Sequence, residues 1–454
     1  MLTLPCAMAV AIVPGEADAC HESKICVEIP VSAADQPVGD FGVSETVVAR
    51  GTRVRLVTPG AEGVTDVWLD DEGCFTYESR YRYGLKLQVF PEAFLGVNAD
   101  VRIRGFDDRP AAVVGIEVSP TVGGTIPWRI DIDYAPAGNA DSPLVVHVNA
   151  DDMADMFGWL IESFYNVDGY AGITGSRDIL VHTEIGDAQA ALGAYNSGDL
   201  IMLGPIARNR KFIVAHEFGH WYQSNWTGLG LGVDYLYEDN GEADPTAAKD
   251  ADCDFQNATN TEEINDLHGL RSAEYSAEAM SEGYAQFMAT LAFNIAVEPE
   301  GSGEGEYQYY KEIIVANQPS YADLVDGNYM VSLLGGTLES TVGGRSAWVQ
   351  NMCPADWNHP LLPESLGEHV SSEIDWMRFF WGFIADPDPS ISMFGTPPDL
   401  RVVLDLFSAA GTLEAQDQYG TFEVAINNPS NASIFPFAQR FESIAIKNGV
   451  KSNE

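Results

Sequence analysis

The chain has 454 residues, of which 46% are hydrophobic, so it is long enough to form two or three domains with apolar cores. Its 67 acidic residues exceed its 24 basic residues and give a net charge of -43, which disfavours nucleic acids and anionic membranes as partners. No run of about 20 apolar residues occurs, so we expect no transmembrane segment.

The first residues have the pattern of an export signal. An apolar stretch over residues 2–13 is followed at residues 17–19 by Ala-Asp-Ala, the small-x-small form that signal peptidases cleave. We therefore predict a signal peptide over residues 1–19 and a protein that is secreted, periplasmic or on the cell surface. Cys20 would be the first residue after cleavage, and a lipid anchor at Cys20 is an alternative that the preceding residues fit poorly.

The cysteines are consistent with export. Six are present, at positions 6, 20, 26, 74, 253 and 353. Disulfides form in the oxidising compartments that exported proteins enter. Because each pair joins neighbouring parts of the expected domains, we predict one bridge between Cys26 and Cys74 and another between Cys253 and Cys353. Free buried thiols are the alternative.

Residues 20–136 are expected to form an all-β sandwich. Turns rich in Gly, Pro and Asp separate short β-rich segments at residues 46–49, 53–57, 65–69, 85–89 and 112–114. Residues 66–75 (Asp-Val-Trp-Leu-Asp-Asp-Glu-Gly-Cys-Phe) resemble the turn-then-strand pattern of transthyretin-like and carboxypeptidase-regulatory-like modules. We expect this β module to position or tether the rest of the chain.

A turn-rich break at residues 135–139 predicts a domain boundary, after which the pattern changes to mixed α and β. Residues 144–148 and 178–182 are expected strands, and residues 151–165 have the apolar spacing of a helix. We expect an α+β domain over residues 137–290. A mainly helical lobe over residues 291–454 should follow, in which residues 370–384 carry apolar side chains at core spacing.

A strand is also expected at residues 194–204 (Ala-Tyr-Asn-Ser-Gly-Asp-Leu-Ile-Met-Leu-Gly). Its opening Ala-Tyr pair and its glycines resemble the substrate-side edge strand of thermolysin-like peptidases, whereas Asn196 replaces a second aromatic residue. The resemblance implies that Ala194, Tyr195 and Asn196 pair with an extended peptide by strand addition. A simple buried strand is the alternative.

Residues 216–220 (His-Glu-Phe-Gly-His) form an H-E-x-x-H motif inside an apolar, proline-free stretch that predicts a helix. His216 and His220 are four residues apart, so their side chains share one helix face with Cβ atoms roughly 6 Å apart. That spacing suits a single Zn²⁺ ion. Glu217 is then a candidate general base for water whose pKa zinc lowers to about 7.

Catalytic zinc normally has three protein ligands and an open position, so a third ligand is needed. Residues 282–285 (Glu-Gly-Tyr-Ala) resemble the E-G-[FY]-A segment of the gluzincin metallopeptidases, in which the glutamate binds zinc. The resemblance implies that Glu282 completes the metal site in a zincin-type catalytic domain. Glu278 and His268 are competing ligands. Gln286, one turn after Glu282, is placed to hydrogen-bond a ligand histidine.

A Gly-rich acidic insertion at residues 227–271 separates the two motifs. Stabilisation of an oxyanion usually requires a Tyr, His or Arg side chain in addition to the metal. Tyr275, His268 and Arg271 are the candidates for this role or for proton donation, and the sequence does not choose among them.

Together these patterns predict a multidomain chain with an N-terminal all-β sandwich, an α+β zincin-type catalytic domain and a helical C-terminal lobe. The expected function is that of an exported zinc metallopeptidase that acts on peptide or protein substrates. Two alternatives stay open: a surface binding or adhesion protein on a catalytically weak zincin scaffold, and a zinc hydrolase of non-peptide substrates.

Overall fold

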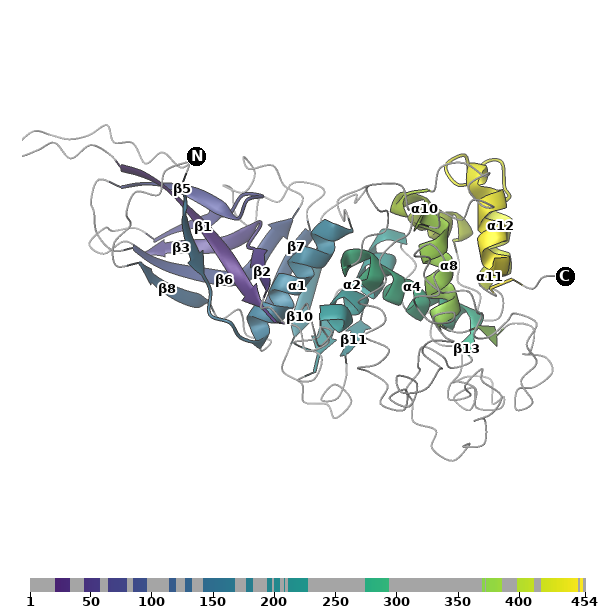
Figure 1. Cartoon of the computed structure of the whole chain (residues 1–454), viewed down its shortest axis with the longest axis horizontal. Helices are drawn as coiled ribbons and strands as arrows, with labels where there is room; N and C mark the ends of the chain where they lie inside the picture. The colour runs from purple at the N-terminus through teal and green to yellow at the C-terminus, as the bar shows by residue number, and fades with distance from the viewer. Residues whose placement is uncertain are drawn as a thin grey trace, which may run out of the picture. The chain divides into compact units, whose positions relative to one another are not determined.

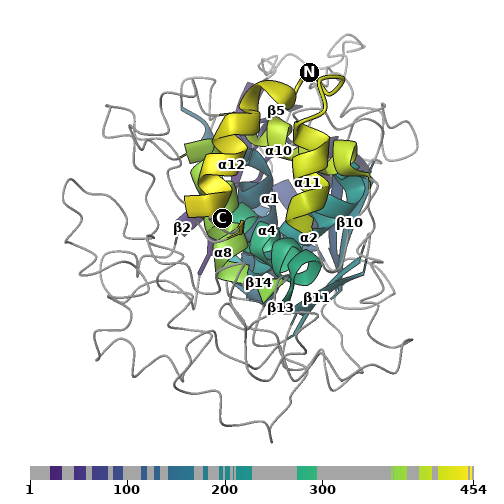
Figure 2. The ribbon, with the colours of Figure 1, turned by 90° about the vertical axis from the view of Figure 1, so that its right-hand side faces the viewer.

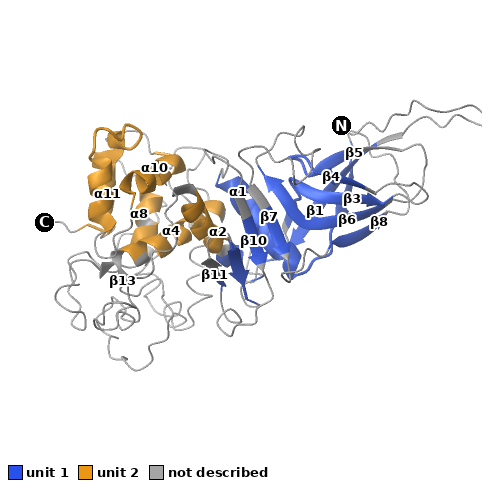
Figure 3. Ribbon diagram, turned by 180° about the vertical axis from the view of Figure 1, so that it is seen from behind, with its two compact units in different colours: residues 1–34, 38–214 blue, residues 35–37, 215–454 orange. Residues whose placement is uncertain are grey.

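The protein forms two compact units, residues 1–34 with 38–214 and residues 35–37 with 215–454 (Figure 3). The computed structural model describes residues 21–32, 45–57, 64–79, 85–95, 114–119, 127–132, 142–167, 177–182, 194–197, 200–204, 208, 211–227, 274–293, 370–371, 373–385, 398–411, 418–447 and 450–451. Each unit is considered by itself.

The first unit consists mainly of β-strands and includes one long helix among its described residues (Figure 1). The helix α1 is Asp152–Asn166. The strands are β1 (His21–Val31), β2 (Glu45–Val48), β3 (Thr52–Val57), β4 (Val64–Trp68), β5 (Cys74–Ser79), β6 (Leu85–Leu95), β7 (Val114–Ser119), β8 (Trp128–Ile132), β9 (Leu144–His147), β10 (Arg177–His182), β11 (Ala194–Ser197) and β12 (Leu200–Leu203).

These strands form two sheets. The smaller has the order β2-β1-β5, with β9 also paired to β1, and the larger has the order β11-β12-β10-β7-β6-β3-β4, with β8 paired to β6. Most pairs are antiparallel, whereas β9 runs parallel to β1 and β10 runs parallel to β7 and β12. The first unit is therefore built from mixed sheets.

β1 shows why this region folds as a sheet. Its alternate residues Ile25, Val27 and Ile29 are fully buried, as the period of two in a half-buried strand requires. In the antiparallel pair with β5, Cys26 stands opposite Cys74, and the two form a disulfide. This confirms the first predicted bridge, whereas Cys253 and Cys353 lie outside the described residues.

Helix α1 packs on strands of both sheets, including β1 and β7. Asp151 caps its N-terminus by accepting a hydrogen bond from the Ala154 amide at 2.8 Å. Asp155 accepts bonds from the amide and hydroxyl of Ser32, which follows β1. Burial raises the pKa of the Asp155 carboxyl above its usual range, and the bonds from Ser32 oppose this shift.

The sheets continue across residue 136, where the sequence predicts a domain boundary. β9 and β10 both follow that position, yet β9 pairs with β1 and β10 pairs with β7. The division between compact units falls instead between Val214 and Ala215. The β-structure of residues 20–136 is thus completed by later strands, because a strand buries its apolar residues only when its neighbours in the sheet are present.

The strand predicted at residues 194–204 is a pair of strands. β11 and β12 are antiparallel, with Ala194 opposite Leu203 and Ser197 opposite Leu200. β11 stands at the end of the larger sheet's strand order, so among the described strands it pairs on one side only. The backbones of Tyr195 and Asn196 belong to this edge strand.

The second unit is mainly helical in its described part (Figure 2). Its elements are α2 (Lys211–Thr227, from Ala215 onward), β13 (Glu274–Tyr275), α4 (Ser276–Phe293), β14 (Val370–Ser371), α8 (Glu373–Ala385), α10 (Leu400–Ala410), α11 (Gln418–Ile426), the 3-10 helix η3 (Phe435–Phe437) and α12 (Ala438–Lys447). The helix expected near residues 370–384 is therefore present as α8.

An aromatic core joins α4 to the later helices. The Tyr284 ring lies 5.5 Å from Phe380 and 5.1 Å from Phe407 between centroids, in edge-to-face geometry. Arg440, which is 1% exposed, donates hydrogen bonds to the carbonyls of Gly382 and Phe383 in α8. The predicted helical lobe thus shares one core with α4. Within the described segments, no helix combines the length and apolar character needed to cross a bilayer.

The disulfide gives a test of the first unit. Replacing both Cys26 and Cys74 by Ser should lower the free energy of unfolding by about 2–4 kcal/mol, because the unfolded chain regains the freedom of a closed loop. The sequence separation of that loop is 48 residues. Urea denaturation followed by circular dichroism measures the loss. Adding reductant to the double variant shows whether the remaining cysteines also contribute to stability. An unfolding midpoint of the double variant equal to that of the wild type would contradict a stabilising role of the Cys26–Cys74 disulfide.

Candidate metal centre

Helix α2 presents two histidines on one face. His216 and His220 are one turn apart, their ring centroids are 4.7 Å apart, and the ring planes are nearly perpendicular at 88°. Their Nε2 atoms approach to 3.1 Å. The side chains are 12% and 7% exposed, respectively, so both imidazoles are largely removed from water.

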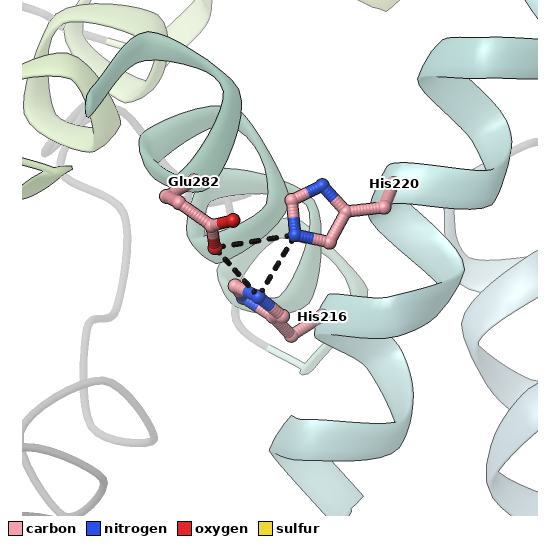
Figure 4. Close-up of side chains that lie close together, drawn as sticks. All are labelled: His216, His220 and Glu282. Atoms are coloured by element: carbon pink, nitrogen blue, oxygen red, sulfur yellow. Dashed lines mark hydrogen bonds and ion pairs between the residues drawn. The ribbon is translucent and has the colours of Figure 1, made fainter. Parts of the chain in front are cut away.

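Helix α4 brings a carboxylate to the same point (Figure 4). Glu282 Oε2 lies 3.1 Å from His216 Nε2 and 3.2 Å from His220 Nε2. The Glu282 side chain is 7% exposed. Two nitrogen atoms and one oxygen atom, from residues separated by 62 positions in the chain, therefore converge on one small volume.

The separations suit a metal ion of the size of Zn²⁺. Ligand atoms about 2.0–2.1 Å from zinc and at the tetrahedral angle are about 3.3–3.4 Å apart. The observed separations of 3.1, 3.1 and 3.2 Å are shorter by only about 0.1–0.3 Å. Two imidazoles with one carboxylate are also a donor set that zinc uses in catalytic sites. His216, His220 and Glu282 are thus able to hold a metal ion.

Glu217 adds a second buried carboxyl group to this helix. It follows His216 directly in α2 and is 5% exposed. A carboxylate is costly to bury in apolar surroundings, and ionisable groups in such positions are concentrated at functional sites. The predicted general base is therefore placed in a protected environment.

The residues that flank Glu282 in α4 are buried, and most of them are apolar or neutral. Ala279, Met280 and Ala285 are fully buried. Burial, with a smaller contribution from the nearby Tyr222, raises the pKa of the Tyr284 phenol well above its usual range, so this group stays neutral near pH 7. Such surroundings have a low effective dielectric constant, which strengthens electrostatic attraction between the ligands and a cation.

One polar contact between the two helices was not predicted from the sequence. Ser281 Oγ donates a hydrogen bond of 3.2 Å to Gln223 Oε1, and both side chains are buried. Gln223 lies three residues after His220 and Ser281 directly precedes Glu282. The position of Gln223 on the histidine face was readable from helical spacing, whereas its partner was not.

Other predicted site residues are placed only in part. Tyr275 belongs to β13, where it pairs with Val370, and Glu278 and Gln286 belong to α4. The structure describes no side chain for Tyr275 or Glu278, and it describes Gln286 as partly buried. Ala194, Tyr195 and Asn196 lie in the first unit. Further candidates lie outside the described residues, namely Cys20, His268, Arg271 and almost all of the insertion at residues 227–271.

Comparison of the chain with family models, with characterised proteins and with solved structures gives no match.

Metal binding can be tested without any assay of activity. Zn²⁺ should raise the free energy of unfolding by about 2.7 kcal/mol when the free ion is at 100 times its Kd. Glu282→Gln should weaken Zn²⁺ binding at least about 10-fold, because a neutral amide replaces an anionic ligand. Isothermal titration calorimetry with Zn²⁺ measures the affinity of the wild type and of Glu282→Gln.

A matched control is Glu423→Gln. Glu423 is a glutamate of the second unit that pairs with Lys451 at 2.7 Å. The same change of charge at this position should leave Zn²⁺ affinity unaltered. Equal affinity of the wild type and Glu282→Gln would remove Glu282 from the ligand set.

Proposed function

We propose that the protein is a zinc-dependent hydrolase that cleaves peptide bonds. The observation that supports this most strongly is the convergence of His216, His220 and Glu282 within 3.2 Å, together with the burial of Glu217, the residue that follows His216 in α2. A structural zinc site needs four closed ligands, whereas three protein ligands with an adjacent carboxylate are typical of hydrolytic centres.

In this proposal each residue has a distinct role. His216, His220 and Glu282 hold the ion, and Zn²⁺ when bound supplies a Lewis acid that makes water nucleophilic near neutral pH. Glu217 accepts the proton from the attacking water and afterwards delivers it to the amine that leaves. The buried surroundings keep other water away from the carboxylate, so the proton stays available for that transfer.

The proposal of a peptide substrate draws on the form of β11 itself. Among the described strands β11 pairs on one side, and an edge strand of this kind can pair with an extended chain. Export is supported by the Cys26–Cys74 disulfide, because stable disulfides belong to oxidising compartments. We therefore propose an exported metallopeptidase of the gluzincin type.

The general base provides the decisive test. Glu217→Gln should retain Zn²⁺ and lose about 99% or more of peptide hydrolysis, which corresponds to about 3 kcal/mol in the activation free energy. Zinc content is measured by elemental analysis. Turnover is measured with casein and with a peptide library, in each case with and without a chelator.

The outcomes separate the alternatives. Near-normal turnover by Glu217→Gln would end the assignment of Glu217 as general base. A wild-type protein that binds Zn²⁺ and cleaves no peptide, but hydrolyses simple esters in a chelator-sensitive way, would indicate a non-peptide substrate. Zinc binding with no hydrolysis of either kind would favour a binding protein.

A further inference from the structure

One face of α2 carries more than the two histidines. Residues that follow one another by three or four positions return to the same side of a helix. His216, Gly219, His220 and Gln223 obey this spacing, so all four belong to one side of α2. Each of them contacts α4 or closely approaches it.

The contacts define how the two helices are aligned. Gln223 meets Ser281, whereas Gly219, one turn earlier in α2, lies against Ala285, one turn later in α4. Later residues of α2 therefore contact earlier residues of α4, so the two helices run antiparallel. Glu282 lies between these two contacts in the chain.

Gly219 is the point of closest approach. A Cβ atom at this position would lie 2.9 Å from Ala285 Cα, 3.0 Å from Met288 Cβ and 3.2 Å from Ala285 O. Two of these neighbours are backbone atoms, so a change of rotamer cannot relieve the clash. Restoring an ordinary contact of 3.4 Å to Ala285 Cα requires a shift of about 0.5 Å, the difference between 3.4 and 2.9 Å.

That shift is large for a metal site. Ligand distances in protein metal sites stay within about 0.2 Å of their ideal values. We propose that Gly219 is a positioning residue: its missing side chain, together with the Gln223–Ser281 hydrogen bond, sets the spacing and alignment of α2 and α4 that make Glu282 a metal ligand. This inference rests on the metal site of the proposed function and is independent of peptide hydrolysis.

The test is a double-mutant cycle read by Zn²⁺ affinity. Gly219→Ala should weaken binding about 10-fold or more by moving Glu282 away, while the histidines still bind. Glu282→Gln should then cost little more in the Gly219→Ala protein, because the carboxylate has already lost its place. The inference would be overturned if the fold-losses in Zn²⁺ affinity of the two single variants multiply in the double variant, as they do for independent sites. It would also be overturned if Gly219→Ala binds Zn²⁺ as tightly as the wild type.

A matched control separates displacement of Glu282 from general damage to folding. Gly158 is also a helical glycine whose added Cβ would clash, with the Val31 side chain in the first unit. Gly158→Ala should therefore lower thermal stability and leave Zn²⁺ affinity unchanged. If both alanine variants weaken Zn²⁺ binding equally, the effect of Gly219→Ala is general and the inference fails.

A second variant covers the case in which Gly219→Ala does not fold. Ser281→Ala removes atoms and introduces no clash, so it should fold and weaken Zn²⁺ affinity about three-fold or more through lost alignment. Ser281→Thr, which keeps the hydroxyl, should recover most of that loss. Equal affinities of the wild type, Ser281→Ala and Ser281→Thr would overturn the role of this bond. No Zn²⁺ binding by the wild type would instead overturn the proposed metal site itself.

Discussion

The second unit depends on one constraint, which is that a buried carboxylate must have compensating partners. Glu282 is 7% exposed, and its oxygen faces two imidazole nitrogens from another helix. A carboxylate so far from water is destabilising unless a cation or hydrogen-bond donors lie beside it. The aromatic core around Tyr284 and Phe380 holds in place α4, the helix that carries this carboxylate.

Local patterns in the sequence predict several strands of the first unit and its helix α1, whereas the sheets continue past the turn-rich stretch at residues 135–139. Alternating apolar residues in β3 and the helical spacing in α1 depend only on near neighbours in the chain. The pairing of β9 with β1 and of β10 with β7 depends on contacts between distant segments. The turn-rich composition of residues 135–139 indicates a local turn. It contains no information about the later strands that join the same sheets, so the stretch resembles a linker between domains.

The centre divides in a similar way. The shared face of His216 and His220 follows from helical geometry alone, and a short segment resemblance identified Glu282 as their partner. Gly219 and Gln223 were part of the same motif region, yet their roles depend on the alignment of α2 with α4. Two helices can pack in many alignments that satisfy the same apolar pattern, so these contacts became readable only when both helices were placed.

The 62-residue separation between His220 and Glu282 affects the free energy of assembling the centre. Closing a flexible loop costs free energy that grows only with the logarithm of its length, about 0.6 kcal/mol for each doubling. The favourable free energy of binding a metal ion and of packing α2 against α4 is larger than this cost. The number of residues between the two helices therefore has only a weak effect on the free energy of bringing Glu282 to the two histidines.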